Sequence, residues 1–112
     1  IAAHLSRQNL RLAQRFELDS YHAILAMVAA GQGWTILTPL ALHHAARFAA
    51  QVDAAPLPFE PLSRTLSLSA RAGVLGDMPG QIADRLRALI ARKVVAPAQT
   101  AAPWLGETLR VL

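Results

Sequence analysis

The hydrophobic pattern of residues 1–38 predicts a helix, a strand, a second helix and a second strand, in that order. Ile1 and Leu5 lie one helical turn apart, so residues 1–9 are predicted to close a helix. Residues 12–18 hold most of their apolar side chains on one alternating face, without Gly or Pro, which favours a strand. Because the chain opens inside a helical pattern and lacks an initiator Met, we expect it to be part of a longer protein.

The second helix is predicted directly after Asp19 and Ser20, whose short polar side chains are typical of helix N-caps. Its apolar positions recur at helical spacing and are Tyr21, Ile24, Leu25 and Val28. Gly31 is predicted to end it, since glycine adopts positive φ without a Cβ penalty. The short apolar run at 34–37 then predicts a buried strand, because Pro39 bounds it.

The order strand, helix, strand within residues 12–38 is that of a βαβ unit, whose strands run parallel with a right-handed crossover. The predicted fold class is therefore α/β, with a parallel βαβ core. Pro39 can occupy the first turn of a further helix over 40–51. The prolines in 52–59 permit only an edge strand or an extended connector, and residues 64–70 alternate cleanly as one more strand.

A final helix is predicted from Asp77 to residue 95, with Pro79 in its first turn. Its apolar stripe consists of Ile82, Leu86, Leu89 and Ile90. Asp84 and Arg87 lie three residues apart and are expected to pair on its surface. Residues 96–112 change character, and they are predicted to form an Ala- and Pro-rich tail.

Composition adds the expectation of uncovered apolar surface. The chain has 112 residues, of which 54% are hydrophobic and 16% charged, as in a folded domain or part of one. A chain of this size normally buries only about two-thirds of its unfolded surface. Because the apolar content is this high, we expect the chain to carry apolar surface that missing partners cover.

Charge and cysteine content exclude several classes of protein. The net charge is +4, but the bases are spread from Arg7 to Arg110 without the stripe that is typical of a DNA-gripping face. The chain has no Cys, which excludes disulfides and thiolate metal sites. Residues 20–46 lack Asp, Glu, Lys and Arg over a length that could span a membrane. Gly31, Gly33 and Pro39 interrupt that run, so we favour a buried helix, turn and strand and predict no membrane contact.

No catalytic, metal or cofactor site is predicted. His43 and His44 point about 100° apart on a helix, which is not the spacing of metal ligands. A hydrolase built on Ser20 and His22 is the enzymatic alternative, but the chain lacks a G-x-S-x-G elbow. In open α/β sheets, ligands lie beyond the carboxyl ends of parallel strands, which here are Leu18-Asp19 and Leu37-Thr38-Pro39. Either Asp19 and Ser20 contact a ligand, or they only cap their own helix.

A family resemblance is carried by Phe-Glu-Leu-Asp-Ser-Tyr at 16–21 and by Met-Val-Ala-Ala-Gly-Gln-Gly-Trp-Thr-Ile-Leu-Thr-Pro at 27–39. In order and spacing, this resembles the effector domains of LysR-type transcriptional regulators, which carry F-E-x-D-S, then V-A-A-G-x-G, then a short apolar strand ending in Pro. Trp34 departs from the small or aliphatic residue expected after the second Gly. The resemblance covers most of residues 1–95.

The resemblance implies a type 2 periplasmic-binding-protein-like fold, in which two α/β lobes close on a small molecule, often a carboxylate or an aromatic metabolite. Residues 1–95 would form the second lobe with the return strand and helix of the first, an incomplete domain, and 96–112 the tail. The effector-binding residues that it implies are Leu18, Asp19, Ser20, Tyr21, Thr38 and Pro39.

The resemblance also implies the chain's partners. The full-length regulator would be a cytoplasmic bacterial dimer or tetramer that binds a small-molecule co-inducer. It would contact DNA only through an N-terminal winged helix-turn-helix outside this chain. Effector binding would shift the lobes, and a ligand shifts such an equilibrium only by its differential affinity for the two states. The alternative is an extracytoplasmic solute-binding protein of a transporter, which shares the fold class but needs a signal peptide.

Overall fold

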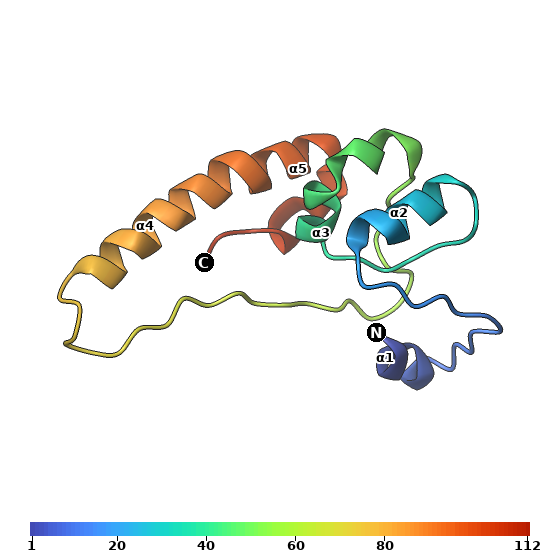
Figure 1. Cartoon of the computed structure of the whole chain (residues 1–112), viewed down its shortest axis with the longest axis horizontal. Helices are drawn as coiled ribbons and strands as arrows, with labels where there is room; N and C mark the ends of the chain where they lie inside the picture. The colour runs from blue at the N-terminus through green and yellow to red at the C-terminus, as the bar shows by residue number, and fades with distance from the viewer. The chain divides into compact units, whose positions relative to one another are not determined.

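Helices joined by extended segments make up the structure, a computed structural model that describes residues 1–112 (Figure 1). The chain divides into unit 1, Ile1–Ala55, and unit 2, Pro56–Leu112. Unit 1 contains α1 (Ala2–Arg7), α2 (Tyr21–Ala29), α3 (Pro39–His44) and the 3₁₀ helix η1 (Ala46–Gln51). The predicted helices near the start of the chain and directly after Ser20 are thus confirmed.

The C-terminus of α2 is closed at Gly31, as predicted. Gly31 has a φ of 75°, and its N–H donates to the carbonyl oxygen of Val28 at 2.9 Å. The N–H of Gln32 donates to the carbonyl oxygen of Met27 at 3.0 Å. These two bonds form a Schellman motif, in which a residue of positive φ satisfies carbonyl groups that the helix leaves free.

The prediction of a single helix over 40–51 is wrong in its length. α3 begins at Pro39 as expected, but it ends at His44, and Ala45 leaves the helical region at φ −101° and ψ 35°. The chain then continues as η1, a tighter 3₁₀ helix of the kind often found at helix ends. Ala45 is completely buried. No local sequence signal predicts this break in the helix.

The structure contains no β-strand, so the predicted parallel βαβ core is not formed in it. The segments 12–18, 34–37 and 64–70 have no helical or strand structure, and no backbone hydrogen bond joins any two of them. Phe16 in the first segment is 67% exposed and Trp34 in the second 64%. Parallel strands are stable when both faces are covered, and an isolated pair of strands is marginal. The segments that contain Phe16 and Trp34 are too exposed to have both faces covered in this way.

In unit 2, a turn through Gly73 and Gly76 leads into the predicted final helix. Both glycines have positive φ, 75° and 52°. α4 (Met78–Ile90) follows, with Pro79 in its first turn as expected. The ion pair predicted between Asp84 and Arg87 is confirmed, with an N–O distance of 3.2 Å.

The helical structure of unit 2 extends past residue 95, into the residues predicted as a tail. The π-helix η2 (Ala91–Val95) and α5 (Ala96–Ala101) continue α4 as one helical rod (Figure 1). Pro97 explains the π turn, because its ring lacks an N–H and conflicts with the carbonyl of Lys93, four residues earlier. The 3₁₀ helix η3 (Pro103–Thr108) then folds back.

The fold-back in unit 2 is held by the Gln99 clamp, by which we mean two hydrogen bonds from one side chain. Nε2 of Gln99 donates to the carbonyl oxygens of Gly106 at 2.7 Å and Leu109 at 3.1 Å. Leu105, directly before Gly106 in the sequence, is only 6% exposed. Nε of Arg87 also donates to the carbonyl oxygen of Leu112 at 3.1 Å. Residues beyond α5 are thereby tied both to α5 and to α4.

Candidate functional site

The six residues implied as effector contacts lie at the starts of two helices. Leu18, Asp19 and Ser20 precede α2, which begins at Tyr21, while Thr38 and Pro39 begin α3. All of them are exposed except Pro39, which is half-buried.

Ser20 and Thr38 occupy equivalent N-cap positions but use their hydroxyl groups differently. The hydroxyl oxygen of Thr38 accepts a hydrogen bond from the N–H of Ala41 at 3.2 Å. Ser20 has the extended backbone of an N-cap, but its side chain makes no capping hydrogen bond. The hydroxyl of Thr38 thus caps its own helix, and that of Ser20 is not committed to α2.

An open concavity of about 410 Å³ lies between α2, the segment before it and the segment after Gly33. Its wall is mainly apolar and includes Phe16, Leu18, Ile24, Met27, Val28 and Ile36. Leu18 is the one member of the implied effector-binding set that lines it. Its volume falls in the range of sites for small molecules, which combine apolar walls with a few polar groups. The concavity is open to solvent, and Phe16 and Trp34 on its wall are 67% and 64% exposed.

The polar groups of the concavity include two residues that sequence reasoning missed, Arg15 and Gln32. A guanidinium nitrogen of Arg15 lies 2.6 Å from a carboxylate oxygen of Glu17. The Gln32 amide makes only a long contact of 3.5 Å, to the carbonyl oxygen of Ala30. Trp34, which is predicted to begin a buried strand and which departs from the family pattern, also lines the wall.

A second concavity of about 370 Å³ adjoins the same segment. Leu5, Leu12 and Arg15 line both concavities, whereas Arg11 lines only the smaller one. Arg15 therefore stands at their common border.

The structure gives no hydrogen bond between Ser20 and His22. No group of three or more His, Cys, Asp or Glu side chains is placed to hold a metal ion. None of the helices has both the length and the apolar character needed to cross a membrane.

Comparison with known families places this geometry in context. Residues 1–91 match the family model described as the LysR substrate binding domain. Neither a curated protein nor a solved structure matches the chain. Domains of this family bind an effector within LysR-family transcription regulators and have a periplasmic-binding-protein-like fold. Since the match spans most of the 112 residues, the chain belongs to the family of LysR substrate binding domains.

Proposed function

We propose that the chain is the effector-binding part of a DNA-binding LysR-type regulator, and that it binds a small molecule without transforming it. The observation that carries the proposal is the concavity of about 410 Å³ in unit 1, within the residues that match the family. Pockets for small molecules usually measure about 300–1,000 Å³ and are mostly apolar.

The ligand class that fits this concavity is a small anion with an apolar body, such as a carboxylate. Phe16, Met27 and Trp34 supply apolar contact area, and Arg15 supplies a positive charge. The implied contacts Leu18, Asp19, Ser20, Tyr21, Thr38 and Pro39 remain part of the proposal. Leu18 lines the concavity and the next three residues follow it directly, at the start of α2. Free backbone N–H groups at a helix start favour an anionic group.

The remaining parts of the proposal concern the whole regulator. We place this chain in an α/β lobe of a two-lobed domain, within a cytoplasmic homodimer or homotetramer. DNA is contacted by a separate winged helix-turn-helix, which agrees with the scattered bases of this chain. The effector acts by binding one lobe arrangement more tightly than the other.

Equilibrium dialysis of the full chain against a panel of small apolar carboxylates tests the proposal. We expect saturable binding of at least one compound, which is recovered chemically unchanged. The same samples are assayed for ester hydrolysis, with Ser20→Ala as the control variant. Turnover that disappears in Ser20→Ala would replace the proposal by a hydrolase, and the absence of any saturable binding would also contradict it.

A further inference from the structure

We propose that Arg15 binds the anionic group of the ligand. In the absence of ligand, the Glu17 carboxylate forms an ion pair with the Arg15 guanidinium, and the ligand anion replaces that carboxylate. This inference rests on the function proposed above and identifies the residues that set its specificity. A ligand of this site must then carry its anionic group within reach of Arg15 while its apolar body lies on the wall of the concavity.

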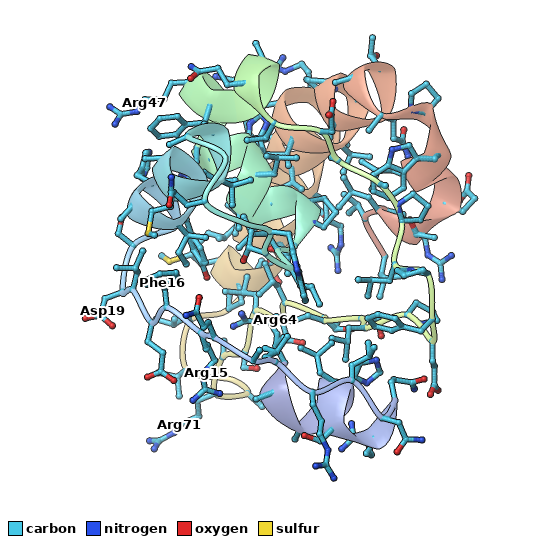
Figure 2. The ribbon with its side chains drawn as sticks, turned by 90° about the vertical axis from the view of Figure 1, so that its right-hand side faces the viewer. Arg15, Phe16, Asp19, Arg47, Arg64 and Arg71 are labelled. Atoms are coloured by element: carbon cyan, nitrogen blue, oxygen red, sulfur yellow. The ribbon has the colours of Figure 1, made fainter.

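The geometry that carries the inference is an ion pair with one partner in the concavity and one outside it. Arg15 lines both concavities of unit 1, whereas Glu17 lines neither. Their charged atoms are 2.6 Å apart, and their side chains are 56% and 74% exposed. The two residues are separated by Phe16, whose ring lines the larger concavity. Figure 2 shows Arg15 and Phe16 along the same extended segment. A cation and an apolar contact surface thus lie side by side.

An exchange of Glu17 for a ligand carboxylate is favoured by the difference between the two environments. Exposed ion pairs contribute little, because water screens them and two long side chains must be ordered. A carboxylate seated in the concavity can accept a bidentate pair from the planar guanidinium, and its body simultaneously contacts Phe16 and Trp34. A neutral ligand of the same shape gains only the apolar contacts with Phe16 and Trp34, because Arg15 remains paired with Glu17.

Glu17 is therefore an internal competitor rather than a ligand contact. Removing its charge frees Arg15 and tightens the binding of anions, whereas removing the charge of Arg15 abolishes the preference for anions. The chain supplies matched controls for both changes. Arg11 lines only the smaller concavity, and Asp53 is an exposed carboxylate of unit 1 that lines neither.

The test compares cyclohexanecarboxylate with the neutral cyclohexanecarboxamide. The chain has two tryptophans, so a Trp104→Phe background leaves Trp34, on the concavity wall, as the one tryptophan, whose fluorescence is excited selectively. Titrations are made at fixed ionic strength on the full chain. We expect the carboxylate to bind about fivefold or more tightly than the amide, as a charge-assisted bidentate pair requires.

The variants decide the assignment. Arg15→Gln removes the preference for the carboxylate and leaves the amide unaffected, whereas Arg11→Gln retains it. Glu17→Gln tightens carboxylate binding about threefold, the range of an exposed ion pair, and Asp53→Asn does not. If both probes bind but Arg15→Gln keeps the preference, or Glu17→Gln fails to tighten carboxylate binding, the inference is overturned and the proposed function stands. If the carboxylate and the amide bind equally, or if neither binds, the inference is overturned, and the dialysis panel described above decides the proposed function separately.

Discussion

The N–H of Gln32 donates to the carbonyl oxygen of Met27 at 3.0 Å, and this bond turns the chain out of α2 at Gly31. The residues that leave the turn, Gln32 and Trp34 among them, line the larger concavity of unit 1. Met27 lines it from the helix side. One helix stop thus sets the position of two walls of the proposed ligand site.

Gly31→Ala is expected to destabilise the protein by about 1 kcal/mol, because an L residue at positive φ is strained. No atom lies within 4 Å of the position of an added Cβ, so this cost comes from the backbone alone. Gly80 is the matched control, since it lies inside α4 without positive φ and its added Cβ would also meet nothing. Gly80→Ala should stabilise by about 0.5 kcal/mol. Urea unfolding measures both, and equal effects of the two substitutions would refute the role of Gly31.

Thr38→Ala is expected to cost about 1 kcal/mol, because the N–H of Ala41 loses its capping partner. Thr38→Ser should restore most of the stability, since it keeps the hydroxyl. Ser20→Ala should change stability by less than about 0.5 kcal/mol, because Ser20 makes no capping hydrogen bond. Thermal unfolding at one protein concentration compares the three variants. A larger loss in Ser20→Ala than in Thr38→Ala would contradict the assigned roles.

The sequence predicts the helix starts and stops well, because their causes are local. Pro39 and Pro79 occupy first turns as expected, and Gly31 adopts the positive φ that only glycine accepts readily. The sequence does not predict the strands correctly, because a strand exists only when a distant segment pairs with it. The break at Ala45 has no local signal in the sequence, and the helix continues past Pro97 through a π turn that the helix-breaking character of proline does not predict.

The candidate site is predicted in part for the same reason. The family pattern locates Leu18 and the start of α2, which adjoin the concavity. Arg15 and Gln32 are ordinary polar residues in the sequence, and they come to line one space only because α1, α2 and two extended segments fold around it. No spacing rule connects residues that meet in that way.

Gln99→Ala is expected to release the segment 103–112, because it removes both hydrogen bonds of the Gln99 clamp. Two such bonds contribute about 1–3 kcal/mol together, so amide hydrogen exchange in this segment should accelerate about tenfold or more. Gln81→Ala is the control, since the exposed side chain of Gln81 on α4 makes no hydrogen bond in the structure. Unchanged protection of residues 103–112 in Gln99→Ala would show that the clamp does not hold them.

The apolar stripe of α4 is expected to make the chain self-associate. Leu86 is 42% exposed, and Ile82, Leu89 and Ile90 of the same stripe are similarly uncovered. Contiguous exposed apolar surface favours association, so the melting transition should be broad and should shift with protein concentration. Leu86→Gln should reduce that dependence, whereas Arg85→Gln, on the neighbouring residue, should not. A sharp melting transition independent of concentration would contradict this expectation.

Sequencing the reading frame immediately upstream of the Ile1 codon tests the central claim most directly. We expect an in-frame first lobe preceded by a basic winged helix-turn-helix, which would make this chain the effector-binding part of a DNA-binding regulator. A signal peptide in that place would contradict the account and would instead make the chain part of an extracytoplasmic solute receptor.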